Sequence, residues 1–475
     1  MRLAWFSPMP PVPSGVAVCS AELVAALRKR HEIDIYVDED LVSRASGADS
    51  AHVFVSRHLL HPYDLTVYQV GNSSHHDYLW PYLFRYPGLT VLHDAHLHHA
   101  RAASLLRTRR AADYRTEFAA NHPDAGPGLA ELAIAGFDNH LYYSFPMTRL
   151  AVQAARLTAV HTEGLAADLN VELSVAAVRP IRLAHGQPVS DVDAHTAGKR
   201  LRARYGIADE ATIFGVFGGL TPEKRIPQIL ESVKAILPYA PAVHLLLVGA
   251  PARHYDVAAD VHARGLDPCV TITGYVDSED ELTAHLAGCD VSLNLRWPTA
   301  REVSGPWLRA LAAGRPTVIT DLAHLSDVPS LDPRTWRVNR GATRGWRLAT
   351  RPDLADCEPL NPNRDRPDPV CVSIDILDED HSLRVAMRRL ATDAGLRVSL
   401  GSAGRQYWAA EHSMPRMLED YERILTEAAS RAAPRVRLPA HLVTDGDVVL
   451  KQILEGFGLE ASHLRSGTAN AWSKL

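Results

Sequence analysis

Short apolar runs alternate with amphipathic segments through most of this chain, and this alternation constrains the fold more than any other feature. Apolar runs bounded by turn residues are typical of buried strands, and helical periodicity between them indicates βαβ units. In the N-terminal part, the pattern predicts a helix over residues 21–28 and strands over residues 3–6, 33–37, 65–68, 89–92, 157–160 and 181–183. The chain is therefore expected to form an α/β fold with parallel sheets.

A second series of the same kind follows a polar segment, Ser190–Lys199, which we interpret as a linker. It predicts strands over residues 212–217, 244–248, 270–273, 290–295 and 317–320, and helices over 227–237, 281–286 and 306–313. The sequence thus predicts two doubly wound, Rossmann-like domains, residues 1–195 and 196–403. Tandem domains of this kind place a ligand crevice between them, at the carboxyl ends of their strands.

The remaining segments do not follow this rhythm. Residues 332–369 are rich in Arg, Asp and Pro and are interpreted as a surface insertion of the second domain. Helices are predicted over 382–394 and 404–423, and residues 404–430 are expected to pack back on the first domain. In the extension 431–475, an amphipathic stretch, 448–457, predicts a packing or self-association helix, hence a possible homo-oligomer, rather than a membrane anchor.

Charge and composition exclude several classes of protein. The net charge of -5 gives no general attraction for nucleic acid. No run approaches the roughly 20 apolar residues that span a bilayer, which leaves only peripheral contact with a membrane open. The apolar run near residue 1 is too short to be the core of a signal peptide. The five cysteines include no C-x-x-C pair and do not suggest a disulfide framework. We therefore expect a cytoplasmic protein.

The most informative segment joins the predicted strand 212–217 to the next helix. It carries Gly218 and Gly219, then Lys224 and Arg225, with Pro227 suited to a first helical residue. Glycines allow close backbone approach, and a helix N-terminus with a lysine favours an anion. The segment outlines a phosphate site, although it matches neither a Walker loop nor a dinucleotide fingerprint.

A second loop follows the same logic. Ser304 and Gly305 are suited to capping a short helix, and Glu302 precedes them where it could accept hydrogen bonds from sugar hydroxyls. The alternative for each loop taken alone is an ordinary strand-to-helix turn with a surface Glu or Lys.

Together these motifs resemble the nucleotide-sugar domain of family 4 glycosyltransferases, which have the GT-B fold of two Rossmann-like domains facing across a cleft. The resemblance rests on Gly218-x5-Lys224, Gly274-Tyr275-Val276 and Glu302-x-x-Gly305, with Ala310 to Pro316 following. In the first half it extends to Ser14-Gly15 and to His93-Asp94. It covers roughly residues 1–425.

The resemblance implies a retaining, hexosyltransferase-type enzyme of the kind that serves polysaccharide biosynthesis. It would move a sugar from a nucleoside-diphosphate donor to a glycan, a lipid-linked sugar or a small molecule, with no further cofactor. Catalysis would fall to Glu302, Lys224, His93 and Asp94. Donor-binding groups would be Gly15, Gly218, Gly219, Lys224, Arg225, Tyr275, Val276, Glu302, Ser304 and Gly305. Cations and helix N-termini would replace a metal at the leaving diphosphate.

The chain contains 24 histidines, which keeps a metal site open as an alternative. They cluster at His75-His76 and at residues 93–99, where His93 follows a predicted strand and the others suit an acceptor cleft or a structural role. Asn72, after another strand, either lines that cleft or occupies a turn.

Two departures from the family pattern leave rival functions open. Gly219 stands where the family usually has an arginine, so Arg225 or another cation would replace it. Arg309 and Ala310 stand near the position of a second family glutamate. The rivals are a sugar phosphorylase of similar fold and a degenerate protein that binds nucleotide sugars without catalysis.

Overall fold

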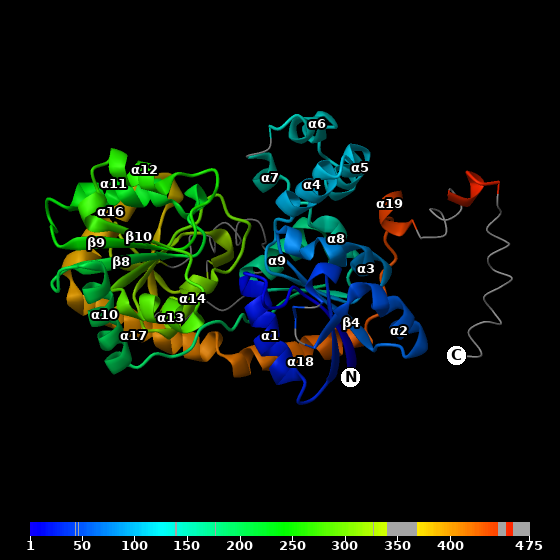
Figure 1. Cartoon of the computed structure of the whole chain (residues 1–475), viewed down its shortest axis with the longest axis horizontal. Helices are drawn as coiled ribbons and strands as arrows, with labels where there is room; N and C mark the ends of the chain where they lie inside the picture. Colours follow the sequence, from blue (N-terminus) through cyan, green and yellow to red (C-terminus); the bar gives the residue numbers. More distant parts are fainter. Residues whose placement is uncertain are drawn as a thin grey trace, which may run out of the picture.

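The computed structural model describes residues 1–339, 368–444 and 453–458, apart from residues 43, 46, 138, 139, 176 and 326. It has two lobes side by side, each built on one sheet (Figure 1). The strand orders are β3-β2-β1-β4-β5-β6-β7 and β10-β9-β8-β11-β12-β15-β13-β14. Among the described strands, all pairs are parallel except β13 with β14. The prediction of two doubly wound α/β domains is confirmed.

The N-terminal lobe is a parallel sheet covered on both faces, and its central strands β4, β5 and β6 are buried along their whole length. Its strands are β1 (Arg2–Phe6), β2 (Glu32–Val37), β3 (Ala48–Ser50), β4 (Leu65–Val70), β5 (Leu89–Leu92), β6 (Leu157–Val160) and β7 (Val178–Pro180). Its covering helices include α1 (Gly15–Leu27), α2 (Phe54–Leu60), α3 (Trp80–Arg85) and α9 (Glu163–Glu172). The last strand forms at 178–180, not at 181–183 as predicted, because residues 181–190 leave the lobe as the connection to the next domain.

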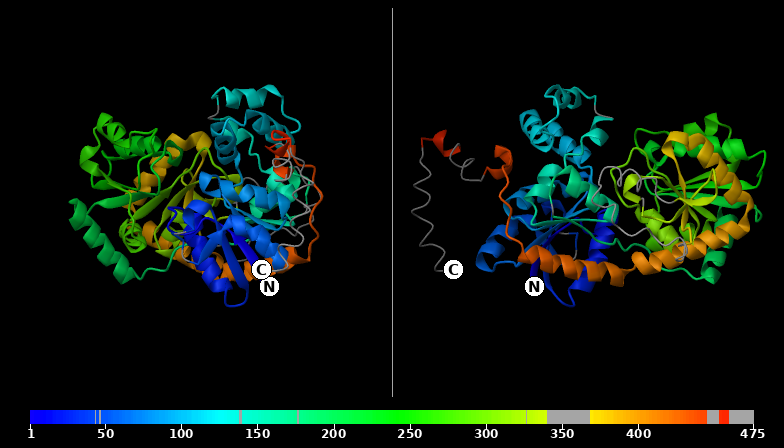
Figure 2. Two further views of the ribbon diagram at one scale, coloured as in Figure 1. Left: turned by 45° about the vertical axis from the view of Figure 1, so that its right-hand side comes forward. Right: turned by 180° about the vertical axis from the view of Figure 1, so that it is seen from behind.

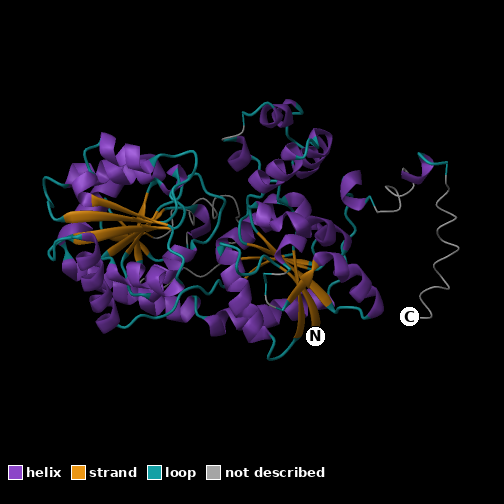
Figure 3. Ribbon diagram, viewed as in Figure 1, coloured by secondary structure: helices purple, strands orange, loops and turns teal. Residues whose placement is uncertain are grey.

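A helical insert, residues 98–154, separates β5 from β6 and rises above the N-terminal lobe (Figures 1 and 3). Its helices are α4 (His98–Arg107), α5 (Ala111–Asn121), α6 (Gly128–Ile134), α7 (Leu141–Ser144) and α8 (Arg149–Ala154). The insert has its own apolar cluster around Leu105, Tyr114 and Phe118. It also contains a buried ion pair between Arg101 and Glu117, whose side chains are 7% and 2% exposed.

The C-terminal lobe repeats the arrangement. Its strands are β8 (Thr212–Phe217), β9 (Val243–Val248), β10 (Val270–Gly274), β11 (Val291–Asn294), β12 (Thr317–Thr320), β13 (Ser330–Asp332), β14 (Arg337–Asn339) and β15 (Cys371–Ile374). Its helices are α10 (Asp191–Tyr205), α11 (Ile226–Ile236), α12 (Val257–Ala263), α13 (Glu279–Gly288), α14 (Gly305–Ala312) and α16 (Glu379–Thr392).

Two segments of this lobe differ from expectation. The predicted linker Ser190–Lys199 is wrong, because the segment forms most of α10. Ser190 caps this helix by accepting from the amide of Asp193, and Gly206 ends it in the left-handed conformation. Part of the predicted insertion 332–369 belongs to the sheet, since β13 and β14 pair as a hairpin. The rest of that prediction, residues 340–367, lies outside the described residues.

The chain returns to the N-terminal lobe through two helices that run along the base of the molecule (Figure 2). The prediction of a single helix over 404–423 is wrong, because two helices form, α17 (Ala394–Glu411) and α18 (Met414–Ser430), with a break at His412. The α17 helix packs against α14. The α18 helix contacts β4 and β6, with the Tyr421 and Trp5 rings 6.0 Å apart. Here the side chain of Asp420 accepts from Arg182 at 3.1 Å.

The C-terminal extension is described only in part. Its short helix α19 (Ala440–Val443) inserts Leu442 into the core of the N-terminal lobe. Of the amphipathic stretch 448–457, residues 448–452 lie outside the described part, while Ile453 and Phe457 are exposed. Self-association through this stretch stays a prediction. In the described residues, none of the helices combines the length and the apolar character that crossing a membrane requires.

Candidate active site

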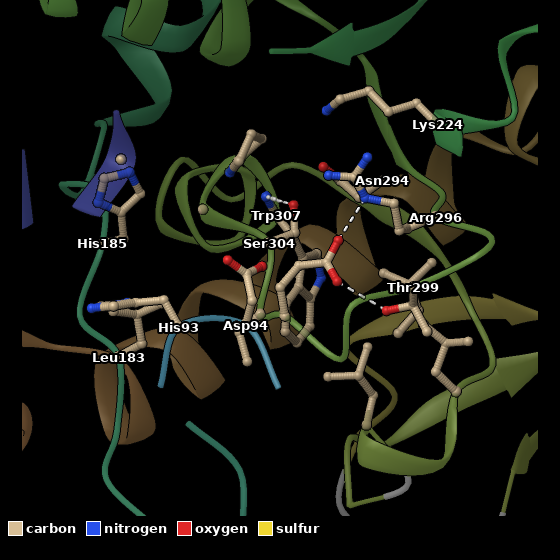
Figure 4. Close-up of a pocket in the computed structure, with 18 of the residues that line it drawn as sticks. His93, Asp94, Leu183, His185, Lys224, Asn294, Arg296, Thr299, Ser304 and Trp307 are labelled. Atoms are coloured by element: carbon tan, nitrogen blue, oxygen red, sulfur yellow. Dashed lines mark hydrogen bonds and ion pairs between the residues drawn. The ribbon is translucent and has the colours of Figure 1, made fainter. Parts of the chain in front are cut away.

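A cavity of about 250 Å³ lies between the two lobes, at the carboxyl ends of their strands (Figure 4). The parallel strands bring the predicted loops together here, as expected for switch points of doubly wound sheets. Its lining includes many of the predicted site residues: Gly15, His93, Asp94, Lys224, Glu302, Ser304 and Gly305.

Two helix N-termini face this cavity, one from each lobe. In α1, the Ser14 hydroxyl accepts from the amide of Val16 at 3.2 Å, and a Cβ on Gly15 would meet no atom within 4 Å. In α14, the Ser304 hydroxyl accepts from the amide of Trp307 at 3.4 Å. Helix N-termini carry unpaired amides and partial positive charge, so both ends favour an anion between them.

Lys224 adds a cationic group to the same wall. It ends a short 3-10 turn (Pro222–Lys224), and its ammonium donates to the carbonyl of Phe217. Gly218 has a φ of +88°, and a Cβ there would stand 3.2 Å from Nζ. Burial and the nearby Arg296 guanidinium lower the pKa of Lys224 to about 7, although Glu302 acts in the opposite direction. The amine is therefore poised to take up a proton when an anion arrives.

Glu302 is held by a network of three donors. Its carboxylate accepts from Arg296 Nε at 2.6 Å and from the Thr299 hydroxyl at 3.0 Å (Figure 4). It also accepts from the amide of Ala300 at 2.8 Å. Burial opposes ionisation, but Arg296 and these hydrogen bonds outweigh it and lower the pKa of Glu302. Arg296 was not predicted as a site residue. Its position two residues after β11, a strand that ends at the cavity, is the signal that could have identified it.

Asp94 brings a second carboxyl group to the cavity from the other lobe. Its Oδ2 accepts from the amide of Asn72 at 2.7 Å. Burial and the nearby Glu302 raise the pKa of Asp94 to about 7, although Asn72 and Arg296 partly offset them. A carboxyl group of this pKa both donates and accepts hydrogen bonds near neutral pH.

His93 lines the cavity, but both of its ring nitrogens are engaged with the protein. Nε2 donates to Oε1 of Gln69 at 2.8 Å, and Nδ1 accepts from Nε2 of His161 at 3.1 Å. Burial and the neighbouring His161 hold the pKa of His93 well below its usual range. Contact between His93 and a donor sugar stays a prediction, and it would have to use the ring carbons or the backbone carbonyl, because the amide donates to Val70.

Other predicted donor-binding residues lie outside this cavity. Arg225 does not line the cavity, and Glu379, 154 residues further along, holds its guanidinium with a hydrogen bond of 2.7 Å from Nε. That Arg225 replaces the missing arginine stays a prediction. Gly219 does not line the cavity, and a Cβ there would meet no atom within 4 Å. Tyr275 is exposed just beyond β10, and Val276 packs on the apolar cluster around Leu286. Base binding by these two residues remains a prediction.

Several histidines of the two clusters are buried, namely His76, His96 and His98, and a role at an acceptor cleft stays a prediction. His98 is buried, with Nδ1 donating to the carbonyl of Phe145 at 2.6 Å. Among the residues that the structure describes, no group of three or more His, Cys, Asp or Glu side chains is placed to hold a metal.

His99 belongs to a small group beside the cavity that includes Tyr143, a residue that the sequence analysis missed. The His99 ring lies 4.9 Å from the Tyr143 ring, and its Nδ1 is 3.3 Å from the side-chain amide of Asn72. Burial and the negative charges of Glu223 and Glu302 raise the pKa of Tyr143, so its hydroxyl lies within electrostatic range of charged groups at the cavity. No strand-end pattern could reveal it, because it comes from α7 of the helical insert.

The two lobes are also hydrogen-bonded at this cavity. The carbonyl of Ala300, next to Glu302, accepts from the amides of Ala95 at 2.8 Å and His96 at 3.2 Å. Arg301 forms an ion pair with Glu172 of the N-terminal lobe at 2.9 Å. Asp94 and Glu302 are therefore held in one continuous site.

A comparison with protein families finds a match in the part of the chain that supplies Lys224 and Glu302 to the cavity. Residues 211–335 match the family described as Glycosyl transferases group 1. This span contains Lys224, Arg296 and Glu302. None of the curated proteins searched matches the chain.

Solved structures share the fold over nearly the whole chain. Sucrose-phosphate synthase from Thermosynechococcus elongatus has a TM-score of 0.59 at 14% identity, with 90% of this chain and 98% of that chain covered. A glycosyltransferase from Rickettsia africae gives 0.56 at 12% identity, covering 91% and 99%. HepE from Anabaena, in complex with UDP and glucose, gives 0.54 at 13% identity, covering 90% and 99%. The chain therefore has the GT-B fold, as predicted.

Proposed function

We propose that this protein is a retaining glycosyltransferase of the family 4 type that uses a nucleoside-diphosphate sugar as donor. The observation that carries the proposal is the convergence on one cavity of the α1 and α14 N-termini, Lys224 and the carboxyl groups of Glu302 and Asp94. Groups of this kind fit an anionic leaving group on one side and a sugar on the other.

The arrangement suits the charges that develop during glycosyl transfer. Breaking the bond from the anomeric carbon to the diphosphate builds negative charge on the leaving group and positive charge on the sugar. Lys224 and the two helix N-termini stabilise the first, and fixed groups of this kind need little rearrangement as the reaction proceeds. Glu302, fixed by Arg296 and Thr299, orients the sugar and offsets part of its positive charge. We propose that these groups supply what a metal ion supplies elsewhere.

The acceptor would approach from the N-terminal lobe. Asp94, with a pKa of about 7, is suited to orient the attacking hydroxyl. His99, Tyr143 and Asn72 lie next to it and offer ring faces and polar atoms to a sugar acceptor. A glycan, a lipid-linked sugar and a small molecule all remain candidate acceptors.

A donor panel tests the proposal. The protein is incubated with UDP-, GDP-, dTDP- and ADP-sugars and candidate acceptors, and release of the nucleoside diphosphate is measured. UDP-glucose is the first choice because HepE, of the same fold, has been solved with UDP and glucose. Release of the nucleoside diphosphate should require an acceptor and should continue in the presence of a chelator. Its rate should fall at least about 100-fold in Lys224→Met or Glu302→Gln.

The rival functions give different results in the same assay. Phosphate-dependent production of a sugar phosphate would identify a phosphorylase. Donor binding without release, with every acceptor, would identify a binding protein. Unchanged turnover in both variants would contradict the assignment of the site.

A further inference from the structure

The connection between the two domains, residues 181–190, passes along the cavity and places His185 in its wall. The side chain of Trp408 donates to the His185 carbonyl at 2.9 Å. Gly186 then packs so closely on α14 that a Cβ would stand 2.8 Å from Cα of Arg309. His185 is therefore held at a fixed place and is 8% exposed.

The protonation of the His185 ring follows from its one side-chain partner. Nε of Arg309 donates to Nε2 of His185 at 2.9 Å. A guanidinium has no acceptor atom and remains protonated, so Nε2 must be the unprotonated nitrogen. The proton of the neutral ring consequently lies on Nδ1. Burial and Arg309 lower the pKa of His185 to about 3, so this neutral form persists through the physiological range.

Arg309 is itself held firmly. Its Nη1 forms an ion pair with Glu279 at 2.5 Å, and its side chain is 13% exposed. Glu22 of α1 also interacts with it electrostatically. The ion pair with Glu279 and the hydrogen bond to His185 thus fix the guanidinium in place, where it orients the imidazole.

The ring is left with one unused donor beside a site built for an anion. Within the described residues, Nδ1–H of His185 makes no hydrogen bond. Gly305, at the start of α14, packs against the Cδ2–Nε2 edge of the ring, since a Cβ there would be 2.9 Å from Cδ2 and 3.2 Å from Nε2. The Nδ1 edge is therefore turned away from this contact, on a ring that lines the cavity. In Figure 4, His185 lies across the cavity from Lys224 and Arg296.

We propose that His185 donates its Nδ1–H to the diphosphate of the donor, and that Arg309 is a positioning residue that fixes the imidazole tautomer. The proposal rests on the proposed function, because it takes a nucleoside diphosphate as the ligand. A neutral N–H donor binds an oxyanion without gaining or losing a proton, and hydrogen bonds to charged groups are the stronger ones. No local sequence motif marks this residue, because the interdomain connection and α14 are far apart in the chain.

Two isosteric substitutions test the donor role. The amide nitrogen of Asn takes nearly the place of Nδ1, whereas that of Gln lies closer to Nε2. His185→Asn should keep the affinity for the nucleoside diphosphate within about threefold, and His185→Gln should weaken it about tenfold or more. Affinity is measured by calorimetry with UDP, GDP, ADP and dTDP, using the nucleotide that wild type binds best. Equal affinities of the two variants would overturn the proposal.

The positioning role of Arg309 has a spectroscopic readout. Proton–nitrogen NMR of the histidine rings should show His185 as the Nδ1–H tautomer, with the Nδ1 signal shifting when the nucleotide is added. Arg309→Met should change the tautomer and raise the donor KM with less effect on kcat, and Arg309→Lys should restore both in part. An unchanged tautomer in Arg309→Met, or no shift on adding nucleotide, would overturn the proposal.

These results are separable from the function itself. Wild-type protein that binds none of the nucleotides contradicts both the proposed function and this inference. Wild-type protein that turns over a donor, while His185→Gln keeps full affinity for its nucleotide, contradicts this inference alone. Circular dichroism and thermal unfolding of each variant confirm that the fold is retained.

Discussion

Donor binding should take up a proton at Lys224, and this prediction follows from the low pKa of its amine. In the ligand-free protein, burial and Arg296 lower that pKa to about 7. A diphosphate beside the ammonium favours the charged form and raises the pKa again. The complex therefore holds more protons than the free protein above pH 7, so donor affinity must fall as the pH rises.

The size of the effect follows from titration of a single group. The free protein is neutral at Lys224 in about 0.1 of the molecules at pH 6, about 0.5 at pH 7 and about 0.9 at pH 8. Binding should take up the same number of protons, and above pH 7 the affinity should fall about tenfold per pH unit. Calorimetry at pH 8 in two buffers of different ionisation enthalpy measures the uptake directly.

Asp94 is the group that could mimic this behaviour, because its pKa is also about 7. An anion bound nearby would raise that pKa and take up a proton as well. Asp94→Asn should keep most of the uptake, whereas Lys224→Met should lose it. Binding at pH 8 without buffer dependence, or full uptake in Lys224→Met, would refute the reasoning.

Three further predictions concern other parts of the molecule. Glu302→Gln should lower kcat at least about 100-fold with a much smaller effect on donor KM, because Gln keeps the acceptor for Thr299 but loses the charge; steady-state kinetics check this. Glu117→Gln should lower the free energy of unfolding in urea by about 3–5 kcal/mol, since it leaves the buried Arg101 guanidinium without its partner charge. Arg115→Met, which removes an exposed partner of Glu131, should have a far smaller effect, and equal losses would contradict this account. Tyr143→Ala should raise the acceptor KM about tenfold more than the donor KM, and the reverse order would exclude Tyr143 from the acceptor side.

Most of the site could be predicted because parallel strands align their carboxyl ends. Lys224, Glu302 and Asp94 each follow a strand that the apolar pattern identifies, so one sheet edge per domain brings them together. The same logic reaches Gly15 and Gly305, which begin helices at that edge.

The sequence could not predict contacts that depend on residues far apart in the chain. Arg225 is directed to Glu379 by a left-handed backbone, with φ of +60°, and by a partner 154 residues away. Both nitrogens of His93 are engaged, one by Gln69 of β4 and the other by His161, the residue after β6. The helix α10 was missed for another reason. Its cap Ser190 and its terminal Gly206 are visible in the sequence, but the polar composition of the segment is typical of a linker.

The central claim is that this cavity binds a nucleoside diphosphate through the diphosphate, and one titration tests it most directly. Wild type and Lys224→Met are titrated with a nucleoside diphosphate and with the matching nucleoside. The account predicts that wild type binds the diphosphate at least about tenfold more tightly than the nucleoside, and that the difference largely disappears in Lys224→Met. Equal affinity of wild type for the two ligands, or the same preference in both proteins, would contradict it.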